Sequence, residues 1–77
     1  MSKVDRDRLY KDEYKKIAAR LRQARQKRGL NQGRVAAMIC ATQSRISKLE
    51  AGILEVGVVE LQELAKIYGK SLDFFIK

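Results

Sequence analysis

Residues 31–52 limit the fold of this chain more than any other stretch, because they read as two short helices joined by a tight turn. Asn31 is a good N-cap for a helix over 32–39, and Thr42 is one for a helix over 43–51. Gly52 suits the end of the second helix, while Cys40 and Ala41 make the turn. The pattern predicts a two-helix unit over residues 32–51.

Packing two helices across a tight turn requires a small side chain where they cross and apolar side chains that lock their angle. The small residue is Ala36, and the apolar ones are Val35, Ile39, Ala41, Ile46 and Leu49. At 3.6 residues per turn, Ile46 and Leu49 share one side of the second helix. The opposite side carries Gln43, Ser44, Ser47 and Lys48. We expect the first side to pack inward and the second, which has no carboxylate, to face a partner.

The rest of the chain predicts three more helices and an all-α bundle of five. The first helix begins near residues 5–11 and runs to 28, with a core stripe formed by Tyr10, Tyr14, Ile17, Leu21 and Ala24. A fourth helix over 58–68 buries one of Val58 and Val59, and Ser71 caps a short last helix. We expect one domain over 1–77, in which residues 1–10 are frayed or form a separate turn.

Composition excludes several functions. The 77 residues contain one cysteine and no histidine, which removes disulfide frameworks, Cys-based zinc clusters and His-dependent catalysis. We therefore expect no enzyme activity, metal, cofactor or small-molecule substrate. No apolar run is long enough to cross a membrane, and the charged N-terminus does not read as a secretory signal. These features favour a cytoplasmic protein.

Positive charge is concentrated in the first part of the chain. Residues 1–28 carry 11 Lys/Arg against 4 Asp/Glu, residues 29–54 carry 3 against 1, and residues 55–77 carry 3 against 4. A net charge of +8 gives affinity for phosphate through counterion release. The nearly neutral last third is left for packing or self-association.

Four segments together resemble the phage-repressor-like family of helix-turn-helix regulators, which includes lambdoid repressors, Cro proteins and restriction–modification controller proteins. They are LNQ at 30–32, VA at 35–36, RISKLEAG at 45–52 and YGKSLDFF at 68–75. The resemblance covers about residues 17–76. It implies a compact five-helix fold and a transcriptional regulator that binds double-stranded DNA sequence-specifically. It also implies a homodimer on an inverted-repeat operator, with two recognition helices about 34 Å apart.

By position, the resemblance assigns a role to each candidate site residue. The DNA bases are contacted by Gln43, Ser44, Ser47, Lys48 and Arg45. The DNA backbone is contacted by Gln32, Thr42, Asn31 and Arg34. Arg25 and Glu50 form a structural salt bridge that holds the recognition helix. The turn position of Cys40 is commonly glycine in the family, and glycine tolerates positive φ at little cost, so a cysteine there implies either strain or a slightly different turn. A lone cysteine is most often a small buried residue, and redox control is the alternative.

Two other functions remain as alternatives. A protein-interaction module of the same fold, of the antitoxin or anti-repressor type, is favoured by the neutral last third and by Phe74 and Phe75. We expect these two residues to lie at the dimer interface, although the core is the competing place for both. A basic amphipathic membrane helix over 11–28 ranks last. Basic and amide groups at 43–48 favour DNA over a protein partner.

Overall fold

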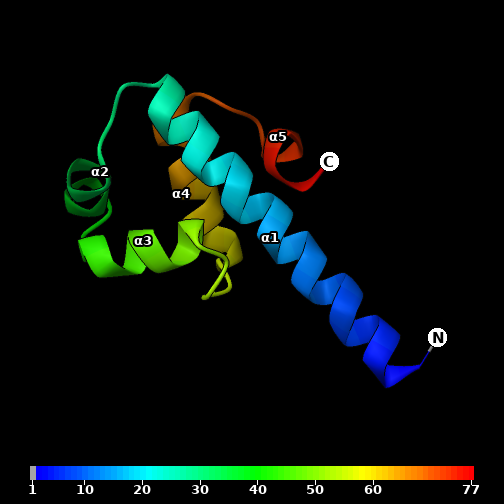
Figure 1. Cartoon of the computed structure of the whole chain (residues 1–77). Helices are drawn as coiled ribbons and strands as arrows, with labels where there is room; N and C mark the ends of the chain where they lie inside the picture. The colour runs from blue at the N-terminus through cyan, green and yellow to red at the C-terminus, as the bar shows by residue number, and fades with distance from the viewer. Residues whose placement is uncertain (1) are drawn as a thin grey trace.

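The computed structural model describes residues 2–77, which form five α-helices and no strand. Their bounds are α1 Lys3–Lys27, α2 Gln32–Met38, α3 Gln43–Glu50, α4 Val58–Tyr68 and α5 Leu72–Ile76. The long helix α1 runs past α3, α4 and α5, while α2 and α3 lie together at one end (Figure 1). The prediction of an all-α bundle of five helices is confirmed.

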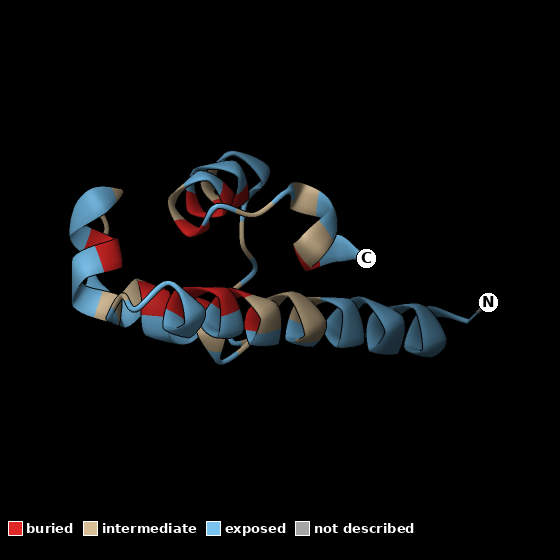
Figure 2. Ribbon diagram, turned by 90° about the horizontal axis from the view of Figure 1, so that it is seen from above, coloured by how far each residue is buried: buried red, intermediate tan, exposed pale blue. Residues whose placement is uncertain are grey.

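The first helix is continuous from Lys3, so the expected separate turn within residues 1–10 is wrong for the described part; Met1 lies outside it. Ser2 caps α1 by accepting a hydrogen bond from the backbone N–H of Asp5 at 3.2 Å. Residues 3–13 are exposed on all sides, and burial begins only where α1 meets the other helices (Figure 2). The first turns of α1 therefore extend beyond the bundle.

Tyr10 was expected in the core stripe of α1, but its side chain is 52% exposed. The periodicity of the stripe is correct, since Leu21 and Ala24 are buried and Ile17 packs against the core. No other helix reaches as far as Tyr10, so the stripe continues into solvent there. Tyr10 lies 5.0 Å from the ring of Tyr14 and donates a weak hydrogen bond of 3.4 Å to Glu55.

Helix ends follow local signals. Asn31 and Thr42 cap α2 and α3, as predicted, by accepting backbone N–H groups at 2.8 and 3.1 Å. Gly69 ends α4 in the left-handed conformation, with φ of 67°. Ser71 occupies the N-cap position of α5, but its side chain makes no capping hydrogen bond. The caps at Asn31 and Thr42 fix where the two short helices α2 and α3 begin.

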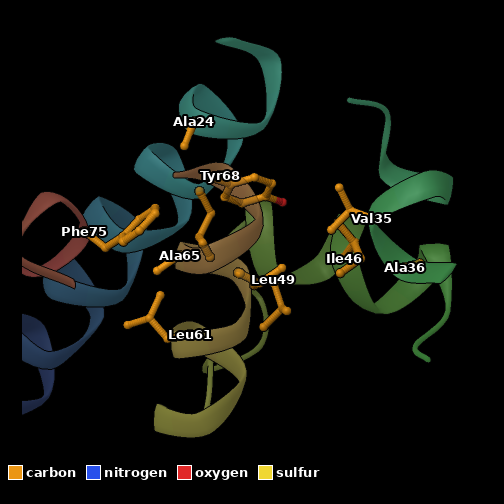
Figure 3. Close-up of a cluster of buried hydrophobic side chains, with 11 residues drawn as sticks. Ala24, Val35, Ala36, Ile46, Leu49, Leu61, Ala65, Tyr68 and Phe75 are labelled. Atoms are coloured by element: carbon orange, nitrogen blue, oxygen red, sulfur yellow. The ribbon is translucent and has the colours of Figure 1, made fainter. Parts of the chain in front are cut away.

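The core lies where the second half of α1 meets the other four helices (Figure 3). The buried hydrophobic residues that form one cluster there are Leu21, Ala24, Val35, Ala36, Ile46, Leu49, Leu61, Leu64, Ala65, Tyr68 and Phe75. One of Val58 and Val59 was expected to join it, but they are 72% and 66% exposed. The inward side of α4 starts only at Leu61, because its first turn projects past the core.

Candidate nucleic-acid interface

The turn between α2 and α3 has an unusual backbone at Cys40. Its φ of 56° makes it the one non-glycine residue with positive φ in the described chain. Ala41 closes the turn by donating its N–H to the carbonyl oxygen of Ala36 at 2.8 Å. Of the two outcomes expected for a cysteine at this position, strain or a slightly different turn, the positive φ corresponds to strain. The expectation of a buried cysteine is wrong, since the Cys40 side chain is exposed.

Small and branched side chains hold α2 against α3 beneath this turn. Val35 is fully buried and Ala36 is 3% exposed, which leaves no room for a larger residue at the crossing. On α3, Ile46 and Leu49 are each 2% exposed and point into the same cluster (Figure 3). The inward side of α3 is therefore as predicted, and it fixes which side of the helix faces solvent.

The outward side of α3 carries Gln43, Ser44, Ser47 and Lys48, which we call the polar strip. All four residues are exposed. The strip contains two hydroxyls, one amide and one ammonium group, and no carboxylate. No carboxylate in the described chain lies within 4.0 Å of the Lys48 ammonium group. The strip therefore presents hydrogen-bond donors and one free positive charge from a helix whose other side is packed.

Three further predicted contact residues lie around the start of α2 and α3. Asn31 and Thr42 are exposed, and each uses its side-chain oxygen to cap its own helix. Arg34 is exposed on the first turn of α2. The structure thus places these three side chains on the surface.

Arg25 and Glu50, predicted to pair, are brought together by the fold. Arg25 donates from Nε to Glu50 Oε2 at 2.7 Å and from Nη2 to Oε1 at 3.0 Å. Arg25 Nη1 also donates to the carbonyl oxygen of Leu30 at 2.9 Å. The hydrogen bond to Glu50 raises the pKa of Arg25. The two side chains are only 11% and 4% exposed, so the pair acts inside the protein.

Two neighbours complete the surroundings of Glu50. Gln32 donates from Nε2 to Glu50 Oε1 at 3.2 Å, a contact that the sequence did not predict. Burial, together with the charge of Glu50, raises the pKa of Tyr68 to about 12. Gln32 is half-buried, so its amide lies at the edge between this network and the surface.

Arg45 was expected to contact bases, but the structure pairs it with Glu60 of α4. Arg45 donates from Nε to Glu60 Oε2 at 2.7 Å and from Nη2 to Oε1 at 2.9 Å. These hydrogen bonds raise the pKa of Arg45 and hold the pKa of the Glu60 carboxyl below its usual value. This pair was not predicted, because no local sequence pattern joins residues 15 positions apart.

The two phenylalanines of α5 lie in different places. Phe75 is fully buried in the core, so its assignment to a dimer interface is wrong. Phe74 is half-buried, packs edge-to-face on Phe75 at 5.0 Å, and has the Lys70 ammonium group 5.0 Å from its ring centroid. Of the pair, only Phe74 reaches the surface.

Residues 2–77 contain neither a candidate metal site nor a helix that could cross a membrane. No group of three or more Cys, Asp or Glu side chains there is arranged to hold a metal ion. No helix in that range combines the length and the apolar character that a membrane crossing requires.

The geometry of the site agrees with a comparison against known families. A family model described as helix-turn-helix matches residues 21–75, from the middle of α1 to the end of α5. Searches of curated proteins and of solved structures found no match. The matched range includes the turn, the polar strip and both ion pairs of α3. The chain belongs to the lambda-repressor-like helix-turn-helix family, whose members are DNA-binding regulators of transcription.

Proposed function

We propose that this protein is a sequence-specific regulator that binds double-stranded DNA by inserting α3 into the major groove. The observation that carries the proposal is the polar strip. It is exposed, free of carboxylates, and borne by a helix whose opposite side is anchored by Ile46 and Leu49. A major groove is wide enough for such a helix, and base edges are read by short polar side chains.

Each residue of the strip has a chemical role in this proposal. Gln43 pairs through its amide with adenine, and Lys48 donates to guanine or to a phosphate. Ser44 and Ser47 can donate to or accept from either strand. These contacts carry sequence information, because each base pair presents its own donors and acceptors in the major groove.

The DNA backbone is contacted from the rim of the strip. Arg34 supplies a positive charge there, while Asn31 and Thr42 lie at exposed helix starts. Gln32 fits the same role, because its Nε2 carries two N–H groups and Glu50 accepts only one. Such contacts fix the register of the protein on DNA without reading sequence.

We further propose a homodimer on an inverted repeat. An eight-residue recognition helix reads only a few base pairs, and a two-fold axis doubles the contacts. Half-buried Phe74 and exposed Ile76 of α5 are the apolar residues that we assign to the interface. Sedimentation equilibrium over a range of protein concentrations tests this part separately from DNA binding.

A second candidate function is a protein-interaction module of the same fold. Val58 and Val59 are strongly exposed, and Val59 lines a groove of about 570 Å³ with Ala65 and Leu72. A surface of this kind suits a protein partner. The proposal of a DNA-binding regulator, acting in the cytoplasm without catalysis or cofactor, is favoured because the polar strip has hydrogen-bonding groups rather than an apolar surface.

Selection of bound duplexes from a random pool tests the main proposal. We expect enrichment of a symmetric site, with half-sites about one helical turn apart. In the same assay Gln43→Ala should change the enriched bases, whereas Arg34→Gln should weaken binding to every sequence alike. A pool that remains random after selection would contradict sequence-specific binding and favour the protein-interaction module.

A further inference from the structure

The ion pair between Arg45 and Glu60 lies beside the proposed DNA-binding surface. Arg45 is one turn before Lys48 and Leu49, so it occupies the edge between the polar strip and the buried side of α3. Its side chain is 42% exposed, against 17% for that of Glu60. The pair therefore joins an exposed arginine of the recognition helix to a largely covered carboxylate of α4.

The position of Glu60 on its helix favours the charged form of its carboxyl group. Glu60 is the third residue of α4, close to the positive end of the helix dipole. The backbone N–H of Gly57 also contributes to lowering the pKa of Glu60, after the larger effect of Arg45. These effects favour the charged form of Glu60, which is the form that accepts both hydrogen bonds from Arg45.

The pairing changes which charges α3 can offer to DNA. The helix contains two cations, Arg45 and Lys48. Both guanidinium nitrogens that face Glu60 are occupied, at 2.7 and 2.9 Å. Lys48 is thus the cation of α3 that has no carboxylate partner in residues 2–77.

We propose that Glu60 is a specificity-determining residue that keeps Arg45 from binding DNA phosphates. This inference rests on the proposed DNA-binding function. A phosphate contact from arginine adds affinity for any sequence, so withholding it lowers binding to random DNA while base contacts by the polar strip are kept. In a chain of net charge +8, keeping one cation of α3 away from phosphates improves discrimination between specific and random DNA.

DNA does not simply pull Arg45 away from Glu60. Release of Arg45 would leave the Glu60 carboxylate unpaired close to the phosphates, where like charges repel. Loss of the Glu60 charge removes that obstacle. Glu60→Gln removes the charged partner, so it leaves the Arg45 guanidinium group free to contact a phosphate.

The test compares three variants on one random duplex, with the dissociation constant measured against salt concentration. Glu60→Gln removes the charge but keeps the size of the side chain. Glu63→Gln is the matched control, because it makes the same charge change on the same helix at an exposed residue without an ion pair in the described chain. The double variant Arg45→Gln/Glu60→Gln removes both partners.

We expect Glu60→Gln to steepen the slope of log affinity against log salt by about 0.9, the value of one added phosphate contact. Between 50 and 200 mM salt, the ratio of the DNA affinity of Glu60→Gln to that of wild type then falls about threefold. Glu63→Gln should leave the slope unchanged, and the double variant should restore it to that of wild type. Equal slopes for Glu60→Gln and Glu63→Gln, or a double variant that stays steep, would overturn the inference.

Other failures are distinguishable. Wild-type protein that binds no duplex at low salt would overturn the proposed function itself, whereas wild-type binding with unchanged slopes overturns only the role of Glu60. Circular-dichroism melts establish that each variant is folded at the temperature of the assay. Should Glu60→Gln not fold, Arg45→Lys tests the same restraint, because lysine cannot form the two parallel hydrogen bonds. It too should steepen the slope, and an unchanged slope would contradict the proposal.

Discussion

Glu50 of α3 accepts two hydrogen bonds from Arg25 of α1, at 2.7 and 3.0 Å, and its side chain is only 4% exposed. A third hydrogen bond, from Gln32, reaches the same carboxylate. The three residues come from three different helices. The last turn of the recognition helix is therefore tied to α1 and α2 by one buried, fully paired carboxylate, which sets how the polar strip is presented.

Substitution of Glu50 should act through stability. Glu50→Ala leaves the Arg25 charge buried without its partner, and we expect the free energy of unfolding to fall by about 3 kcal/mol. Urea denaturation followed by circular dichroism measures this change. Glu63→Ala, at an exposed position of α4, is the control and should change the value by less than about 0.5 kcal/mol. A Glu50→Ala variant as stable as the control would show that the pair does not hold α3.

Substitutions of the two phenylalanines of α5 should affect stability and dimerisation differently. Phe75 is fully buried, so Phe75→Ala should lower the free energy of unfolding by about 3–5 kcal/mol. Phe74 is half-buried, so Phe74→Ala should cost less in the monomer but weaken the proposed dimer. Urea denaturation and sedimentation equilibrium on both variants make the distinction. Equal losses of stability would contradict the assignment of Phe74 to the surface.

Local features of this fold were predictable from the sequence. The caps at Asn31 and Thr42 and the bounds of α4 each depend on a few neighbouring residues. The inward residues of α3 were predictable too, because Ile46 and Leu49 follow helical spacing. The candidate site is local in the same sense, since its polar strip lies on one short helix.

Features that depend on distant residues were not predictable from local patterns, and the Arg25–Glu50 pair was predicted only through the family resemblance. Periodicity placed Tyr10 on the correct side of α1, but it carries no information on how far the other helices extend along it. Glu60, the partner of Arg45, is 15 residues away on another helix, and Arg45 was predicted to contact DNA rather than a carboxylate. The contact of Gln32 with Glu50 depends in the same way on how α2 is placed against α3.

The ion pair of Glu60 should make stability depend on pH in the acid range. The pKa of Glu60 in the folded protein lies below its ordinary value of 4.5, because Arg45 hydrogen-bonds to the charged carboxylate. The pair therefore stabilises the fold above that pH, and the stabilisation is lost as the pH falls through the folded-state pKa. We expect wild type to be more stable than Glu60→Gln at pH 7, and the gap to close below about pH 4.

Thermal melts at several pH values measure that gap. Glu63→Gln serves as the control for removal of a carboxylate without an ion pair in the described chain, and it should differ little from wild type at any pH. A gap between wild type and Glu60→Gln that stays constant from pH 7 to pH 3 would mean that the carboxylate charge is not what stabilises the fold.

The strained turn at Cys40 should be relieved by glycine. A residue with a Cβ atom at φ of 56° costs roughly 1–2 kcal/mol relative to the right-handed conformation, and glycine avoids that cost. Because the Cys40 side chain is exposed, its removal loses little packing. Part of the gain is offset by the greater entropy of glycine in the unfolded chain. We expect Cys40→Gly to raise the free energy of unfolding by about 0.5–1 kcal/mol.

Cys40→Ala is the matched control, because it removes the thiol but keeps the Cβ atom and hence the strain. Urea denaturation should therefore show a gain for glycine and none for alanine, and an equal gain for both would place the cost in the thiol rather than in the backbone.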